Sequence, residues 1–284
     1  HPHSFLRLPN GHVLASFQHM HHPGIDMPMD ALGGSGGLVE IDDRGNVIRS
    51  VSTADPAWPD ALLMPYSLVV LADKDRVLVT NSSMHDTDPD GHSYQVYRLS
   101  DLKLLKTEYF DTGGRHYGDT NPEEPRLAAD GSVFVQTLAC GVERVTGIGS
   151  ATPKSKLVYL FPGVHCGVPT LVGHYLIQSV PVLHGVVVLD IANPTKPREV
   201  SRVKLDDAIL PHWTSWDPAT GRLVVTGYDE RRLFLLTLDQ TTGALALDTA
   251  FHDTDGKPGF NFTDRHWPHG WTGTAVPHGV VFSR

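Results

Sequence analysis

The chain has 284 residues and a formal net charge of −9 at neutral pH. This acidity argues against nucleic acid and anionic membranes as partners, and no apolar run approaches the length of a membrane span. No signal peptide is visible, so we expect a soluble protein and leave its compartment open between periplasm, extracellular medium and cytoplasm. The 2 Cys exclude a disulfide scaffold, and whether Cys140 and Cys166 pair depends on the fold. The unusual number is 17 His.

One hairpin pattern recurs along the whole chain, and Leu210–Gly227 shows it most clearly. It begins with Pro-His and a short apolar strand, turns at Asp217–Gly221 and returns in the strand Arg222–Thr226. Pro fixes φ in such a turn and Gly accepts a positive φ. Repeated hairpins at this period predict an all-β chain, a β-propeller built from four-stranded blades in a single domain, 1–284. The inner strands are predicted to start near residues 3, 66, 123, 165, 212 and 269.

The first half of the chain predicts three blades. In the first, a loop over Gln18–Gly37 is rich in His and Met, side chains that suit copper, and we expect it to cover the mouth of the central channel. In the second, the Asp-rich loop Ser83–His92 lacks the spacing of a calcium loop and is predicted to be solvated. The predicted strands of the three blades are Phe5–Leu8, His12–Phe17, Leu38–Ile41, Val47–Val51, Tyr94–Leu99, Lys103–Tyr109, Pro125–Ala128, Val133–Leu138, Val142–Val145 and Leu157–Phe161.

The second half predicts two further blades and the start of another. No segment has sustained helical periodicity. We therefore predict about six to seven blades, with a terminal blade that is incomplete in this chain and is closed by an N-terminal segment outside it. The predicted strands are Tyr175–Val180, Gly185–Ile191, Arg198–Leu205, Trp213–Trp216, Arg222–Tyr228, Leu233–Asp239 and Leu245–Ala250.

A metal site is predicted where the inner strands begin. The first strand of each blade lines the central channel, so residues that follow the leading Pro converge on one axis. Four imidazoles there, with a carboxylate, would hold copper, or alternatively iron or zinc. A different copper site would use the amine and imidazole of His1, if His1 is the mature terminus. The convergent residues are His3, Tyr66, Glu123, His165, His212 and His269, of which the four His are the predicted metal ligands.

Several stretches resemble the selenium-binding protein family, whose bacterial members include methanethiol oxidases. The resemblance implies a propeller, and for some members a copper-dependent oxidase that uses dioxygen on a small thiol such as methanethiol. The family's Cys-Cys motif has no counterpart here, and the chain is shorter than the usual member. The stretches that carry the resemblance are His3-Ser4, Gly11–Ser16, Gly36–Asp42, Tyr66, Arg76–Thr80, Glu124–Arg126, Leu183–Gly185 and Asp190–Arg198.

The predicted function is therefore a metal-dependent, copper-containing oxidase acting on a small substrate. Glu123 lies in the repeat register and Glu124 matches the family, so either is a candidate metal ligand, an acceptor that orients a His, or a general base. Tyr66 would donate a hydrogen bond or act as a redox-active neighbour. One alternative is a non-catalytic propeller that binds a metal or a partner. A third possibility is a metal-dependent lactonase. Such enzymes have an oxygen-rich metal site, which a set of four His matches poorly. The oligomeric state stays open.

Overall fold

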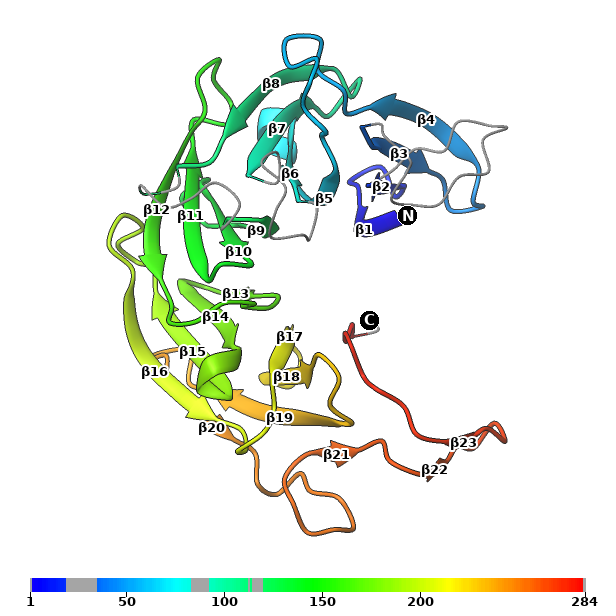
Figure 1. The fold of residues 1–284 in the computed structure, drawn as a ribbon, viewed down its shortest axis with the longest axis vertical. Helices are drawn as coiled ribbons and strands as arrows, with labels where there is room; N and C mark the ends of the chain where they lie inside the picture. Colours follow the sequence, from blue (N-terminus) through cyan, green and yellow to red (C-terminus); the bar gives the residue numbers. More distant parts are fainter. Residues whose placement is uncertain (1, 19–34, 83–91, 112, 114–119, 283–284) are drawn as a thin grey trace. The chain divides into compact units, whose positions relative to one another are not determined.

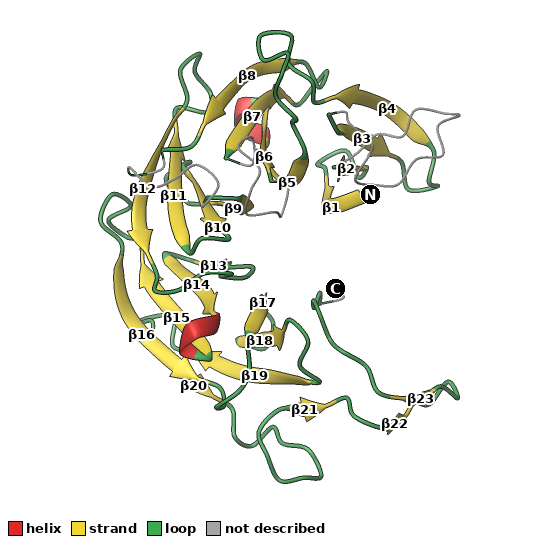
Figure 2. Cartoon of the chain, in the orientation of Figure 1, coloured by secondary structure: helices red, strands yellow, loops and turns green. Residues whose placement is uncertain are grey.

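The computed structural model describes residues 2–18, 35–82, 92–111, 113 and 120–282 (Figure 1). The chain forms two compact units, His1–Leu157 and Val158–Arg284, which are described separately. The single domain predicted from the sequence stays a prediction. Among the described residues the structure has strands and two short 3-10 helices, Ala72–Lys74 and Pro181–Leu183, and no α-helix (Figure 2). The predicted all-β class is thus confirmed.

Unit 1 holds three four-stranded sheets, and each sheet follows chain order with antiparallel neighbours. The outer strand of the third sheet, β12, crosses the boundary into unit 2. The strands are β1 (Pro2–Arg7), β2 (Val13–Phe17), β3 (Gly37–Ile41), β4 (Val47–Ser52), β5 (Pro65–Leu71), β6 (Arg76–Asn81), β7 (Ser93–Arg98), β8 (Leu104–Tyr109), β9 (Pro122–Leu127), β10 (Val133–Thr137), β11 (Gly141–Thr146) and β12 (Lys154–Leu160).

Unit 2 holds two further sheets of the same order and a small hairpin. The short strand β21 adds to the fifth sheet by pairing with β19. The strands are β13 (Thr170–Val172), β14 (Tyr175–Val180), β15 (Gly185–Asp190), β16 (Arg198–Lys204), β17 (Pro211–Asp217), β18 (Arg222–Gly227), β19 (Arg232–Leu238), β20 (Leu245–Leu247), β21 (Phe260–Asn261), β22 (Arg265–His266) and β23 (Thr272–Gly273).

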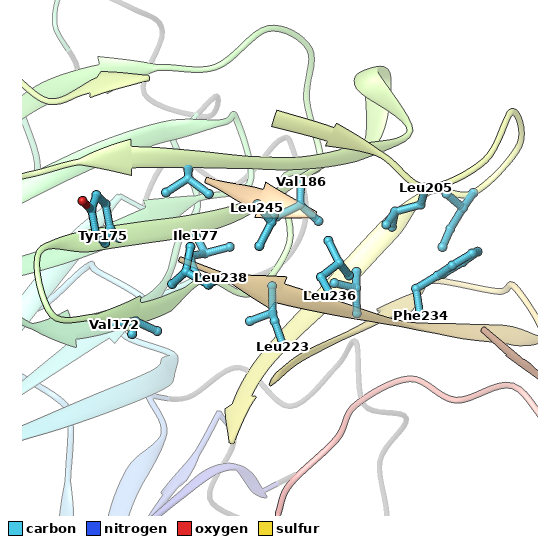
Figure 3. Packing of buried hydrophobic residues seen from close by; sticks show 13 residues of the cluster. Val172, Tyr175, Ile177, Val186, Leu205, Leu223, Phe234, Leu236, Leu238 and Leu245 are labelled. Atoms are coloured by element: carbon cyan, nitrogen blue, oxygen red, sulfur yellow. The ribbon is translucent and has the colours of Figure 1, made fainter. Parts of the chain in front are cut away.

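Apolar side chains from neighbouring sheets form the cores of both units. In unit 2 one cluster joins Ile177 of β14 to Leu223 of β18 and Leu236 of β19 (Figure 3). In unit 1 two clusters join the first sheet to the second and the second to the third. Central strands such as β14 are buried along their whole length, because both faces of the sheet are covered. Such strands show continuous apolar runs in place of clean alternation.

The inner strands β1, β5, β9 and β17 share one irregularity. In β5, Pro65 lies opposite Asn81 and Leu68 opposite Val79, so three steps on the inner strand match two on its neighbour. The same extra residue occurs between Pro2 and Phe5 and at the matching positions of β9 and β17. This is a β-bulge, which re-aims side chains and is common beside active sites. The bulged residue pairs are His3-Ser4, Tyr66-Ser67, Glu123-Glu124 and His212-Trp213.

Two of the predicted inner-strand starts are wrong. The fourth sheet begins with β13 at Thr170, and His165 lies in the loop before it with a φ of 62°. The Pro of that stretch is Pro169, directly before β13, so the strand starts later than a register that begins at Val164 predicts. His269 lies in the turn between β22 and β23. The loop predictions for Gln18–Gly37 and Ser83–His92 fall largely outside the described residues.

Candidate functional site

A carboxylate, two hydroxyls and a guanidinium meet where the bulges of β1, β5 and β9 lie. Glu124 Oε2 accepts a hydrogen bond of 2.8 Å from Ser67 Oγ. The same oxygen is 3.1 Å from Nη1 of Arg126, which forms an ion pair with the carboxylate. Ser67 Oγ is also 3.3 Å from Ser4 Oγ. One residue from each of three sheets thus joins in a continuous hydrogen-bonded chain, Ser4–Ser67–Glu124.

The neighbouring carboxyl group, Glu123, points elsewhere. It is buried, with 2% of its surface exposed, and its Oε2 accepts a hydrogen bond of 2.9 Å from Gln136 Nε2. Burial raises the pKa of Glu123 to about 8, and the nearby carboxylate of Glu124 acts in the same direction. Glu123 is therefore protonated at neutral pH. Between the two carboxyls that the sequence proposed, the structure places Glu124 with the hydroxyl groups and Glu123 against the amide of Gln136.

His3 and Tyr66 pack against each other beside this chain. Their ring centroids are 3.7 Å apart, and His3 Nδ1 lies 3.1 Å from the backbone oxygen of Tyr66. Because a carbonyl only accepts, His3 Nδ1 carries the proton in this contact. Tyr66 is buried, with 3% of its surface exposed, whereas His3 is half-buried. The predicted residues His3, Tyr66, Glu123 and Glu124 thus belong to one neighbourhood of unit 1.

A hydroxyl opposite the bulge of β1, and another opposite the bulge of β5, connect one sheet to the next. Ser16 Oγ accepts from the backbone nitrogen of Ser4 at 3.0 Å and donates to the backbone oxygen of Tyr66 at 2.8 Å. Thr80 Oγ1 repeats this arrangement, accepting from the nitrogen of Ser67 at 3.2 Å and donating to the oxygen of Glu123 at 2.6 Å. Each hydroxyl therefore satisfies a backbone group that the bulge removes from the strand ladder.

In unit 2, aromatic rings gather at the matching bulge of β17. His212 is buried, with 7% of its surface exposed, and its ring centroid lies 4.1 Å from that of Tyr228 and 4.4 Å from that of His278. Thr226 Oγ1 donates to the backbone oxygen of His278 at 2.8 Å, as Ser16 and Thr80 do to their neighbours. His278 thus occupies the register position predicted for His269, and that prediction is wrong. The pair Pro277-His278 was the missed signal, since it repeats the Pro-His that opens β17.

The other two predicted metal ligands of unit 2 are His165 and His269, and the side chains of both are exposed. The backbone oxygen of His165 accepts a hydrogen bond of 3.1 Å from the hydroxyl of Tyr228. Within the part of the chain that the structure describes, no group of three or more His, Cys, Asp or Glu is placed to hold a metal ion. Cys140 and Cys166 are fully buried, and no described cysteine is free.

No protein-family model and no curated protein matches the sequence. Among solved structures, a hypothetical selenium-binding protein from Sulfolobus tokodaii aligns with a TM-score of 0.63 at 13% identity, over 87% of this chain and 64% of that one. The periplasmic gluconolactonase of Pseudomonas aeruginosa aligns with a TM-score of 0.61 at 14% identity, over 87% and 68%. A streptogramin B lyase aligns with a TM-score of 0.54 at 14% identity, over 87% and 67%.

The fold is a β-propeller. At these identities the likeness shows the fold alone, and the relationship to a selenium-binding protein is a distant one between propellers. This chain spans less than two thirds of that protein's length. Several neighbours of the fold are enzymes by name.

Among the described residues, no helix is long and apolar enough to cross a membrane.

Proposed function

We propose that the chain is a hydrolase for small carboxylic esters or lactones, with Glu124 as its base. The observation that carries this proposal is the position of the Glu124 carboxylate, fixed between the Ser67 hydroxyl and the Arg126 guanidinium. Four His at the strand starts do not make the oxygen-rich site of a lactonase. The described site in unit 1 is rich in oxygen, since it combines the hydroxyls of Ser4 and Ser67 with two carboxyl groups.

A general base must be ionised, oriented and within reach of the proton that it takes. Arg126 orients Glu124 through the ion pair, and Ser67 places a hydroxyl proton against the same carboxylate oxygen. The Glu124 side chain is 10% exposed, so it lies at the edge of the buried interior. This arrangement supports proton removal from a hydroxyl group that attacks a substrate carbonyl.

The protonated state of Glu123 supports the same role. Two ionised carboxylates on adjacent residues would repel each other, and a buried one would lack solvation. Glu123 keeps its proton below its pKa of about 8, and the ion pair with Arg126 is made by Glu124. Gln136 holds the neutral group in place through its amide hydrogen bond. Because Glu123 is neutral, it adds no second negative charge beside Glu124.

The test is a hydrolysis assay with an aryl acetate, a γ-lactone and a δ-lactone. Glu124→Gln keeps the size of the side chain and removes the base, so turnover should fall by at least about 100-fold. Glu108→Gln is the matched control, because Glu108 pairs with Lys106 on the surface of the same unit. The proposal fails if no substrate of the three classes is hydrolysed, or if Glu124→Gln turns over at the wild-type rate.

The copper-dependent oxidase predicted from the sequence is the second candidate, and the contact between His212 and His278 favours it. Two imidazoles are fewer than the three or four protein ligands that such metal sites have, so the described residues do not complete a site and we derive no step through a metal. Copper, iron or zinc as the metal, dioxygen as the co-substrate, and His3, His165, His212 and His269 as the ligands stay predictions.

Metal analysis separates this candidate from the hydrolase. Protein purified without chelator or His-tag should contain stoichiometric copper, and should consume dioxygen with methanethiol, if the oxidase prediction holds. His212→Ala should then lose metal and oxidase activity with the fold intact. Full metal content and unchanged turnover in this variant would remove His212 from the site. Protein that neither hydrolyses the ester panel nor consumes dioxygen would support the non-catalytic alternative.

A further inference from the structure

Ser4 lies at the outer end of the hydrogen-bonded chain that leads to Glu124. It is the second residue of the β1 bulge, and its side chain is half-buried. Ser67 lies in the middle of the chain and is 1% exposed, so a dissolved molecule can reach Ser4 far more easily. The backbone nitrogen of Ser4 donates to Ser16 Oγ, which fixes the main chain at this position.

The order of protons along the chain follows from the acceptor at its inner end. An ionised carboxylate can only accept, so Ser67 donates its single hydroxyl proton to Glu124 at 2.8 Å. The proton between the two serine oxygens, which are 3.3 Å apart, then comes from Ser4. The lone pair of Ser4 Oγ that attacks a substrate gains electron density from this donation. Arg126 orients the carboxylate in turn, which completes the sequence of nucleophile, relay, base and orienting group.

We propose that Ser4 is a catalytic nucleophile that forms an acyl-enzyme with the ester or lactone substrate. This inference rests on the proposed hydrolase function and assigns Ser67 as the relay between Ser4 and Glu124. Ser4 and Ser67 come together only through the fold, since 63 residues separate them. Figure 1 shows β1 and β5, which carry the two serines, as neighbouring inner strands.

The step balances without any further reactant. Ser4 Oγ forms a bond to the substrate carbonyl carbon while its proton passes to Ser67 Oγ and the proton of Ser67 passes to Glu124 Oε2. The carbon–oxygen bond to the leaving group then breaks. Glu124 returns its proton to Ser67 Oγ, and Ser67 donates its own proton to the leaving alkoxide, because the acylated Ser4 Oγ no longer carries a proton. Water attacks the acyl group in a second round of the same transfers and frees the acid. Nothing is oxidised or reduced.

The experiment treats the full chain with a fluorophosphonate probe, which phosphonylates activated serines, and locates the adduct by peptide mass spectrometry. We expect an adduct on Ser4 that falls by at least about 100-fold in Glu124→Gln. Ser100 is an internal control, because its hydroxyl also donates to a carboxylate, that of Asp75 at 2.8 Å, on the exposed surface. Its adduct should stay at background.

Ser4→Ala and Ser67→Ala are tested in parallel for hydrolysis and for thermal unfolding. Both should lose at least about 100-fold in turnover, and Ser4→Ala should unfold at the wild-type temperature because its side chain is half-buried. Hydrolysis that persists in Ser4→Ala overturns the inference and leaves the hydrolase standing. An adduct on Ser4 without hydrolysis of the ester panel supports the nucleophile and overturns the proposed substrate class. An unlabelled protein that hydrolyses nothing overturns both.

Discussion

The hydroxyl of Thr226 donates a hydrogen bond of 2.8 Å to the backbone oxygen of His278, which is 52 residues away in the sequence. Ser16 and Thr80 make the same bond to Tyr66 and Glu123 in unit 1. In each case the hydroxyl lies opposite a bulge of an inner strand, and in unit 1 it reaches the inner strand of the next sheet. The repeated bond gives His278 its place in the repeat, although residues 274–282 form no named strand.

Replacing Thr226 by Val should loosen the segment that carries His278. Val has the shape of Thr but cannot donate, so a part-buried carbonyl loses its partner at a cost of about 1 kcal/mol. Amide exchange in residues 279–282 should become faster in Thr226→Val and stay unchanged in Thr226→Ser. Thr220→Val is a control, since the hydrogen bond from that hydroxyl to Asp217 lies at the exposed surface. Equal exchange in Thr226→Val and Thr226→Ser would contradict the assignment.

Glu123 should make the protein less stable as the pH rises. Its folded pKa of about 8 lies above the ordinary value of 4.5, so the folded state keeps a proton that the unfolded state releases. The stabilisation is fully present below pH 4.5 and is lost progressively up to about pH 8, by at most about 1.4 kcal/mol per pH unit. Glu123→Gln cannot release a proton, so its unfolding temperature should fall less between pH 5 and pH 8 than that of the wild type. Parallel curves for the two proteins would refute this prediction.

Arg49 should be important for the stability of the first two sheets. Its Nε pairs with Glu40 at 2.6 Å, and its other nitrogens donate to the backbone oxygens of Leu99 and Ser100. The Glu40 side chain is 3% exposed, so removing Arg49 leaves a buried charge with fewer partners. Arg49→Met should destabilise the protein by roughly 2 kcal/mol in urea unfolding. Arg98→Met, which breaks an exposed pair in the same unit, should change stability by less than about 1 kcal/mol.

The Glu40 cluster also has a pH signature opposite to that of Glu123. Burial acts to raise the pKa of Glu40, but hydrogen bonds from Asn10, His12 and Arg49 and the charge of Arg49 outweigh it and lower the pKa. The stability that this carboxylate contributes is present above the ordinary value of 4.5 and is lost as the pH falls further. Glu40→Gln should therefore weaken the acid-induced loss of stability. Unchanged acid unfolding in this variant would show that Glu40 does not contribute to it.

Gly167 should tolerate no side chain. A Cβ there would lie 1.9 Å from the backbone oxygen of His212, which also accepts a hydrogen bond of 2.6 Å from Val168. Gly167→Ala must displace β17 at the bulge, and we expect a loss of at least about 3 kcal/mol in unfolding free energy. Gly149→Ala is the control, because the nearest atom to its Cβ would be a lysine methylene at 3.5 Å. Similar stability of the two variants would contradict the observed packing.

Much of the architecture was predictable from local signals. The Pro that opens β5, β9 and β17 and the turn residues between strands marked the hairpins of these sheets correctly. Strand-like stretches predicted β14, β15 and β16 close to their observed bounds. These features depend on neighbouring residues, because turn geometry and strand patterning are local properties of the chain. In the fourth sheet the Pro that marks the strand is Pro169, directly before β13, and the position of His165 lies ahead of this signal.

The composition of the site was decided by the tertiary structure. A bulge shifts the facing of the residues that follow it, so strict alternation could not tell Glu123 from Glu124. The contacts of Ser67 with Ser4 and with Glu124 join positions 63 and 57 residues apart, and neither serine carries a motif. His278 likewise gained its place through Thr226, across 52 residues. Local sequence signals determined where the hairpins that open at β5, β9 and β17 begin and turn, and long-range packing determined which side chains meet at the strand ends.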